Sequence, residues 1–300
     1  MLGRTIRIYL DNGSVTGIKH SEIVNWSGQA ISSPRKLVKD LKEWTEAQRP
    51  GVYFLFGLDE NGNESVYIGE SENIFERLVQ HVSDSKKDFW DEVIFFTSKD
   101  ENLTKAHVKF LESKLTLLAK EANRYKVLNG NSPQQSKLPR GDRDSMEEFI
   151  NNTKILIGAM SHKVLEPIYK QPTTKETAIK DDHNSIDNSI IELFLKIKKI
   201  NSKAILTEEG IVVQKDSEAF LSEKDSLVVS YKNLRKKLQD EKILIQNDDK
   251  LIFTQDYLFP SPSQAAAVIV GYAINGRSTW CLPDGTTLKE YEEKQLSEDI

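Results

Sequence analysis

The residues Pro50–His81, PGVYFLFGLDENGNESVYIGESENIFERLVQH, predict two strands joined by a turn and followed by the start of a helix. Side chains alternate between the two faces of a strand, so the letters VYFLFG place V, F and F on one face and Y, L and G on the other. The polar letters DENGNE supply the turn. Tyr53 and Tyr67 are therefore expected on neighbouring strands of one hairpin.

The helix behind this hairpin carries an arginine and a histidine. In SENIFERLVQHV, Ser71 is the candidate N-cap, and Ile74 and Leu78 belong to one apolar face. Arg77 and His81 are four residues apart, a spacing that places two side chains on the same side of a helix. A guanidinium and an imidazole are thus expected to project together from one side of this helix.

Composition excludes several classes of protein. The chain has 300 residues, of which 38% are hydrophobic and 29% are charged, so it can form two or three modest domains with cores of their own. Its single cysteine, Cys281, rules out an internal disulfide framework and suits a reducing compartment. We find neither a secretory signal pattern at the start nor an apolar stretch long enough to span a bilayer. We therefore expect a cytoplasmic protein that does not associate with membranes.

Charge is distributed unevenly along the chain. The net charge of −5 argues against a strongly basic coat for nucleic acid. Residues 84–104 are mostly acidic, whereas 105–126 carry six Lys or Arg against two Glu. An anion site is expected near the second stretch, where Lys105 and Lys109 are candidates for DNA contact. The same basic face could equally be only solvated.

The remaining segments predict an α+β fold. RTIRIYLDNGSVTGIKH predicts a hairpin turning at Asp-Asn-Gly, and SSPRKLVKDLKEW a helix with Ser33 as N-cap and Pro34 in its first turn. DEVIFFTS predicts a third strand. NLTKAHVKFLESKLTLLAKEA predicts a long helix in which Glu112 lies beside a leucine stripe. The predicted parts are an N-terminal β-hairpin and helix (1–48), a domain around the opening hairpin (49–132), a helix with a polar linker (133–187) and a C-terminal α+β domain (188–300).

The triplets Gly51-Val52-Tyr53 and Tyr67-Ile68-Gly69 resemble those of the GIY-YIG nuclease family. The resemblance covers about residues 49–130 and extends to the helical Arg77 and His81 and to Glu112. It implies a small domain with a central antiparallel sheet flanked by helices. It also implies an endonuclease, that is, a metal-dependent hydrolase that cuts phosphodiester bonds of DNA.

The resemblance assigns a role to each matching residue. Tyr53 resembles the tyrosine that activates the nucleophile, and Arg77 the arginine that contacts phosphate. Glu112 resembles the carboxylate that holds one Mg²⁺ or Mn²⁺ ion. His81 and Tyr67 would orient groups or relay protons.

Two glycines and an asparagine complete the motif. Gly51 and Gly69 are the glycines of the two triplets, and Gly69 would let the backbone approach closely at the strand end. For the family's asparagine the chain offers Asn123, Asn129 and Asn131, of which we select Asn129. Each matched residue also has an ordinary interpretation, because hairpin tyrosines usually pack and helical Arg or Glu side chains are usually solvated.

Near the C-terminus, FPSPSQAAAVIVGYAINGRSTW resembles a domain of unknown function that is often attached to such nucleases. Its Asn275, Gly276 and Trp280 fit that pattern. Arg277 could contact a phosphate and Trp280 could stack on a base, or the two could form a turn and a core aromatic. Three alternatives stay open: DNA binding or a protein partner for this domain, and a first domain that binds nucleic acid without cutting it.

Overall fold

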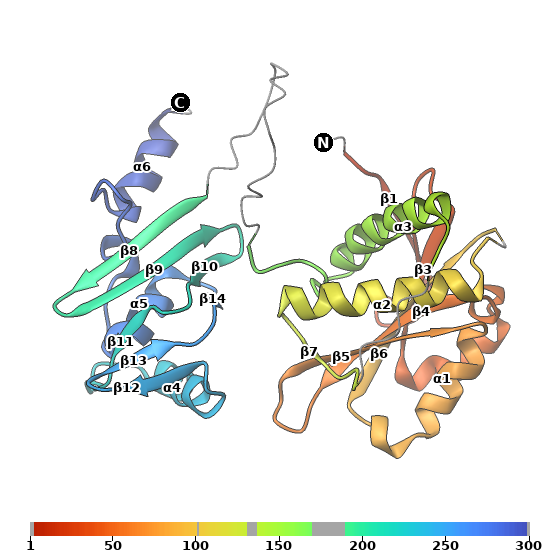
Figure 1. The fold of residues 1–300 in the computed structure, drawn as a ribbon, viewed down its shortest axis with the longest axis horizontal. Coiled ribbons are helices and arrows are strands. Elements are labelled where there is room, and N and C mark those ends of the chain that lie inside the picture. Colours follow the sequence, from red (N-terminus) through yellow and green to blue (C-terminus); the bar gives the residue numbers. More distant parts are fainter. Residues whose placement is uncertain (1–2, 101, 131–136, 170–189, 299–300) are drawn as a thin grey trace. The chain divides into compact units, whose positions relative to one another are not determined.

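The computed structural model describes residues 3–100, 102–130, 137–169 and 190–298. The chain divides into two compact units, Met1–Ile168 and Tyr169–Ile300, and both mix helices with sheets (Figure 1). The fold class is therefore α+β, as the sequence predicts. Each unit is described by itself below.

The first unit is built on one seven-stranded sheet. Its strands are Ile6–Leu10 (β1), Lys19–Ile23 (β2), Gly28–Pro34 (β3), Gly51–Leu58 (β4), Glu64–Ser71 (β5), Trp90–Ser98 (β6) and Lys126–Val127 (β7). Their order in the sheet is β1-β2-β3-β6-β4-β5-β7. All pairs are antiparallel except β5 with β7, which is parallel and covers only Ser65 and Val66 of β5. Most of the outer edge of β5 therefore has no neighbouring strand among the described residues.

Helices cover both faces of this sheet. The α-helices are Ile74–Ser83 (α1), Lys105–Ala122 (α2) and Arg140–Ala159 (α3), and the 3-10 helices are Asp11–Gly13 (η1), Arg35–Glu43 (η2), Thr45–Gln48 (η3) and Ser85–Lys87 (η4). In Figure 1, α2 and α3 lie on one side of the sheet and α1 on the other. Val52 and Phe54 alternate with Tyr53 and Leu55, so the first pair packs into the core under α2 and α3 and the second pair into the core under α1.

The helix expected at Ser33 begins later and has a different form. Ser33 is buried in β3, where it pairs with Val93, and its hydroxyl donates to the carbonyl of Pro34. The 3-10 helix η2 then begins at Arg35, without a side-chain N-cap. The residue before a proline favours an extended backbone, which explains why Ser33 continues the strand.

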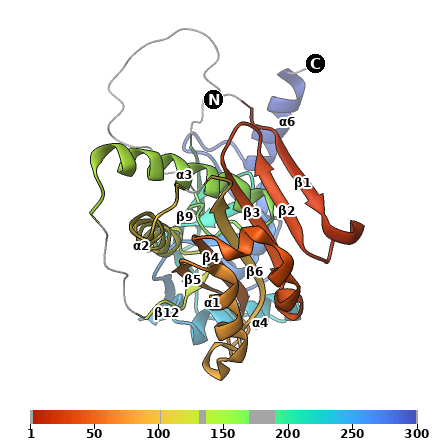
Figure 2. The same ribbon diagram turned by 90° about the vertical axis from the view of Figure 1, so that its right-hand side faces the viewer.

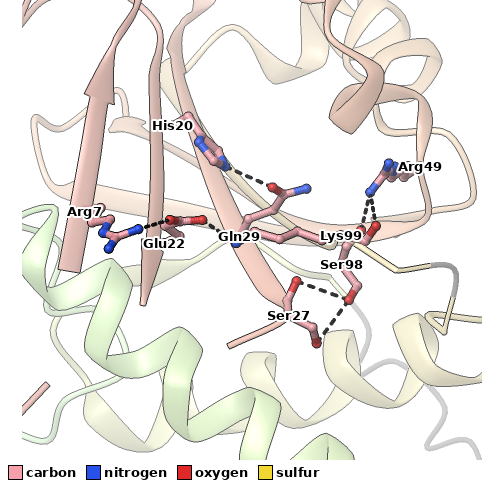
Figure 3. A network of polar contacts seen from close by, with 8 residues as sticks. All are labelled: Arg7, His20, Glu22, Ser27, Gln29, Arg49, Ser98 and Lys99. Atoms are coloured by element: carbon pink, nitrogen blue, oxygen red, sulfur yellow. Dashed lines mark hydrogen bonds and ion pairs between the residues drawn. The ribbon is translucent and has the colours of Figure 1, made fainter. Parts of the chain in front are cut away.

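Residues 1–48 do not form a separate part. Strands β1 to β3 extend the same sheet that contains the opening hairpin, as Figure 2 also shows. A polar network joins the two regions (Figure 3): Arg7 and Lys99 pair with Glu22, and Arg49 donates to the carbonyls of Ser98 and Lys99. The boundary predicted at residue 48 therefore falls inside one continuous sheet.

The second unit contains two small sheets and three α-helices in its described part. Its strands are Ile191–Ile197 (β8), Ile200–Thr207 (β9), Gly210–Val213 (β10), Glu218–Phe220 (β11), Leu244–Asn247 (β12), Lys250–Phe253 (β13) and Tyr257–Phe259 (β14). Its helices are Val229–Asp240 (α4), Pro262–Val270 (α5), Leu288–Glu298 (α6) and the 3-10 helix Gly276–Ser278 (η5). The sheet orders are β14-β10-β9-β8 and β11-β13-β12. Thr207 and Gly210 pair at the turn between β9 and β10, and α5 begins after Ser261, whose side chain accepts from the backbone N–H of Gln264.

One buried cation organises the core of this unit. The guanidinium of Arg235 is fully buried and bonds to the carbonyls of Val268 and Phe220 and to the carboxylate of Glu223. It thereby joins α4 to α5 and to the end of β11. Arg235 belongs to the basic letters KNLRKK, so part of that charge serves packing rather than the surface.

We find no helix in the described ranges that combines the length and the apolar character needed to cross a membrane.

Candidate active site

Tyr53 and Gly69 face each other across the hairpin. They are paired in the register of β4 and β5, and Tyr53 is fully buried. A Cβ atom added at Gly69 would lie 2.3 Å from the hydroxyl oxygen of Tyr53. The tyrosine side chain therefore occupies the space that any other residue at position 69 would need. The glycine of the second triplet is explained by this contact.

The Tyr53 hydroxyl contacts two groups from helix α1. Its oxygen lies 2.7 Å from Nε2 of His81, and Nε of Arg77 donates to it at 3.4 Å. Arg77 and His81 lie on the same side of the helix, as their four-residue spacing predicts, and both side chains reach the Tyr53 phenol. Which of Tyr53 and His81 donates depends on the imidazole tautomer.

Helix α1 begins at a different cap from the predicted one. Asn73 is the N-cap, and its side chain accepts from the backbone N–H of Glu76 at 3.1 Å. Ser71 is instead the last residue of β5, and its hydroxyl donates to the carbonyl of Asn73. The prediction of Ser71 as the cap was wrong by two residues, because β5 is longer than the motif alone indicates.

Burial sets the protonation of both hydrogen-bonded groups. Burial, and then the neighbouring Tyr67, raise the pKa of Tyr53 well above its usual range, against the opposing effect of Arg77. Burial, followed by the charges of Lys87 and Arg77, lowers the pKa of His81 to about 3. At neutral pH the pair is therefore a phenol beside a neutral imidazole, which can accept the phenolic proton.

Tyr67 lies beside this pair and is only partly buried. Its ring centroid is 6.3 Å from that of Tyr53 and 5.6 Å from that of His81. Burial raises its pKa, with a further contribution from the negative charge of Glu112. Tyr67 therefore connects the buried pair to the part of the site that solvent reaches.

Glu112 reaches the same site from the other side of β5. It lies on α2, is half-buried, and has no hydrogen bond or ion pair within the described residues. Burial, and then the charge of Glu70, raise its pKa to about 7, although Arg77, Lys109 and Lys87 oppose this rise. Within the described ranges, no three His, Cys, Asp or Glu side chains gather as a metal cluster. Any ion here would be held by very few carboxylates.

Asn129 secures the open edge of β5 next to the site. Its side-chain oxygen accepts from the backbone N–H of Ile68 at 3.1 Å, and its side-chain nitrogen donates to the carbonyl of Ile68 at 2.7 Å. This amide takes the place of a neighbouring strand between Tyr67 and Gly69. Of the alternatives, Asn123 is the left-handed C-cap of α2, and Asn131 lies outside the described residues.

At Gly51, a side chain would clash with the neighbouring strand. A Cβ atom there would lie 2.3 Å from the carbonyl oxygen of Phe96 on the neighbouring strand β6. The glycine therefore allows β4 and β6 to approach closely at the start of the strand that carries Tyr53.

The residues expected to bind nucleic acid are placed unequally. Lys109 is exposed on α2, one turn before Glu112. Lys105 is exposed but pairs with Glu72 at 2.6 Å. In the second unit, Arg277 pairs with Glu292 of α6, and its guanidinium is therefore already partnered.

Trp280 belongs to the core of the second unit. It is fully buried, and its indole N–H donates to the carbonyl of Pro262 at 3.1 Å. Of the two interpretations left open for this residue, the core aromatic is the one observed, since a buried indole cannot stack on a base.

Two further residues of the site, Glu70 and Lys87, were not predicted from the sequence. Glu70 follows the second triplet, and the two-residue period of a strand places it on the same face as Ile68, toward α2; that signal could have identified it. Lys87 lies in η4, and its ammonium is 3.2 Å from the centroid of the Tyr67 ring. The letters SDSKKD around it look like an ordinary exposed loop, so no sequence signal pointed to it.

Comparison with known proteins adds one finding, which concerns the second unit. Residues 193–292 match the family model "Domain of unknown function (DUF4357)". No curated protein and no solved structure matches the chain. The match agrees with the resemblance stated for the C-terminal segment and covers nearly all of the described second unit.

Proposed function

We propose that the first unit is a GIY-YIG nuclease domain that hydrolyses phosphodiester bonds of DNA. The observation that carries this proposal is the contact of one buried phenol, Tyr53, with both His81 and Arg77. Glu112 and Tyr67 lie at the open side of the same group. The DUF4357 match adds support, because this domain is often seen with GIY-YIG nucleases.

Glu112 fits the role of the metal ligand. Glu112 is a half-buried carboxylate with no hydrogen-bond or ion-pair partner in the described part of the chain, and its pKa is raised to about 7 because burial and Glu70 outweigh the nearby positive charges. A hard divalent cation suits such a carboxylate, with water and phosphate oxygens as its other ligands. When bound, Mg²⁺ or Mn²⁺ would supply positive charge beside the phosphoryl oxygens and acidify nearby water.

The remaining steps belong to the protein's own side chains. As a water oxygen attacks phosphorus, the Tyr53 oxygen accepts a water proton while its own proton passes to Nε2 of His81. The bond from phosphorus to the leaving oxygen breaks, and that oxygen takes a proton from solvent. Arg77 holds the negative charge that accumulates on the phosphoryl oxygens.

Substrate binding would also prepare His81 for this transfer. Besides burial, the causes of its low pKa are the positive charges of Lys87 and Arg77. A phosphate group beside these cations would offset their charge, so the imidazole becomes a stronger base when substrate is present.

The experiment is incubation of the purified protein with single-stranded, duplex and branched DNA, with Mg²⁺, with Mn²⁺ and with a chelator. We expect metal-dependent cleavage by the wild type and none by Glu112→Gln, with folding and DNA affinity retained. Glu121→Gln is the matched control, because Glu121 is an exposed glutamate near the end of the same helix. DNA binding without cleavage under every metal condition would refute the nuclease and favour a non-catalytic nucleic-acid-binding domain.

A further inference from the structure

Lys87 occupies an unusual place for a lysine. Its ammonium lies 3.2 Å from the centroid of the Tyr67 ring, and the residue is half-buried. Within the described residues, this ammonium forms no ion pair and no hydrogen bond to oxygen. Its neighbour Lys86 also has none, but Lys86 is exposed and can be hydrated. A partly desolvated ammonium that no carboxylate neutralises favours the binding of an anion.

The turn that carries Lys87 is firmly held at both ends. The guanidinium of Arg35 donates to the carboxylate of Asp88 at 2.8 Å, and to the carbonyls of Trp90 at 3.3 Å and Val82 at 3.4 Å. Inside the turn, the carbonyl of Asp84 accepts from the backbone N–H of Lys87 at 2.9 Å. Lys87 is thus presented to Tyr67 from a fixed backbone, as a binding site requires.

The surroundings of Lys87 identify the kind of anion. Tyr67, which Lys87 contacts, lies 5.6 Å from His81 between ring centroids, so Lys87 belongs to the same site, and its charge acts on His81. Burial and the charge of Arg77 lower the pKa of Lys87 to about 8, because the positive charge of Arg77 disfavours a second cation in its vicinity. A phosphodiester offers two non-bridging oxygens that carry one negative charge, and can be shared by a guanidinium and an ammonium.

We propose that Lys87 is a second phosphate-binding residue of this site, which holds the substrate phosphate together with Arg77 beside the face of Tyr67. The proposal rests on the proposed nuclease function. The 3-10 turn after α1 then contacts the substrate directly through Lys87. Tyr67 positions the Lys87 ammonium through a cation–π contact.

The first test needs no cleavage. Thermal unfolding of the wild type, Lys87→Met, Lys87→Arg and Lys86→Met is followed in sodium chloride and in inorganic phosphate at matched ionic strength. We expect phosphate to raise the melting temperature of the wild type and of Lys86→Met by the same amount. The rise should be smaller for Lys87→Arg and absent for Lys87→Met. Equal phosphate stabilisation of wild type and Lys87→Met, or no stabilisation of the wild type, would overturn the proposal.

The second test uses duplex DNA in chelator, over a series of salt concentrations. Loss of a charged hydrogen bond predicts about 10- to 100-fold weaker binding by Lys87→Met, and one phosphate contact fewer lowers the slope of log affinity against log salt by roughly 0.9. If the wild type cuts DNA and Lys87→Met binds and cuts equally well, the proposal is overturned while the nuclease function stands. If no DNA is bound or cut but the phosphate shift still requires Lys87, the anion site stands and the nuclease function fails.

Discussion

At the scale of single residues, the site depends on the packing of Tyr53 against Gly69 of the neighbouring strand. Because Gly69 has no side chain, the Tyr53 ring fits beside β5, and its hydroxyl oxygen lies 2.7 Å from Nε2 of His81. Burial keeps the phenol protonated and the imidazole neutral, because it raises the pKa of the first and lowers that of the second. A hydrogen bond between two neutral groups is the resting state from which a proton can move.

Substituting Gly69 by alanine tests this packing of Tyr53. The new Cβ atom would lie 2.3 Å from the Tyr53 oxygen, so the phenol must move away from His81. Overpacking of this kind typically costs about 1–3 kcal/mol of the free energy of unfolding, and we expect cleavage to fall even where the protein stays folded. Gly158→Ala is the control, because nothing lies within 4 Å of a Cβ atom there. Full activity and wild-type stability of Gly69→Ala would contradict the packing described here.

The protonation of Glu112 predicts a pH-dependent stability. Its pKa is raised from 4.5 to about 7 in the folded protein, so the folded state binds this proton more tightly than the unfolded chain does. The stabilisation from the neutral form is complete below about pH 4.5 and is lost as the pH rises through 7. Glu112→Gln should therefore gain stability relative to wild type across that interval and keep a constant advantage above it.

Denaturant unfolding at several pH values measures this difference, with Glu121→Gln as the control. Mg²⁺ should reduce the advantage of Glu112→Gln at pH 8, because a bound cation stabilises the ionised carboxylate only in the wild type. A difference between the two proteins that does not change with pH would show that Glu112 keeps its ordinary pKa.

At the scale of elements, the site is assembled where β5 lacks a neighbouring strand. The parallel partner β7 covers only Ser65 and Val66, and the amide of Asn129 then bonds both backbone groups of Ile68. From α2, on the far side of the strand, the charge of Glu112 acts on Tyr67. The short β7 and the asparagine that follows it thus shape the opening of the site.

Removal of this amide should loosen the edge strand. Asn129→Ala leaves the N–H and carbonyl of Ile68 without their partner, which costs about 1–3 kcal/mol of the free energy of unfolding. Cleavage should fall as well, since Tyr67 and Gly69 flank the freed residue. Asn61→Ala is the control: Asn61 lies in the exposed turn of the hairpin, so the change should stay within about 0.5 kcal/mol. Equal stability of both variants would show that the Asn129 amide does not stabilise the edge of β5.

The sequence predicted elements better than it predicted their ends. Alternation along VYFLFG identified the strand, and the four-residue spacing of Arg77 and His81 identified the helical face, because both periods are set by backbone geometry. The N-cap was misplaced at Ser71, and Ser33 was taken for a helix cap, because both serines belong to strands whose ends depend on pairing partners distant in sequence. Lys87 could not be found, since its role arises only when η4 folds back onto Tyr67.

At the scale of the whole molecule, the chain combines two units with separate cores. Every residue of the proposed catalytic site lies in the first unit, and the DUF4357 match lies in the second. In the second unit Trp280 is buried and Arg277 is paired with Glu292, so neither residue expected to contact DNA there is free to do so. Arg235 is buried as well, whereas the adjacent Lys236 of α4 is exposed.

A fragment of residues 1–168 should fold and cut DNA with the same metal dependence as the full chain, because it holds the complete proposed site. If the second unit binds phosphate groups of DNA, its removal weakens binding and lowers the salt slope by roughly 0.9 for each phosphate that is no longer neutralised. Binding titrations of both proteins at several salt concentrations measure this. Superimposable affinities and slopes would mean that the second unit does not hold DNA and would favour a protein partner for it.

The most direct test of the central claim is the single-turnover rate of DNA cleavage by Tyr53→Phe. This change removes only the hydroxyl that contacts His81 and Arg77, and loss of proton transfer typically lowers a rate by about 10²–10⁴-fold. Tyr125→Phe is the matched control, because its hydroxyl lies 3.4 Å from Nδ1 of His162 instead. We expect near-wild-type cleavage by Tyr125→Phe and a loss within that range for Tyr53→Phe. Equal rates for Tyr53→Phe and the wild type across several pH values would make Tyr53 a packing residue and contradict the account.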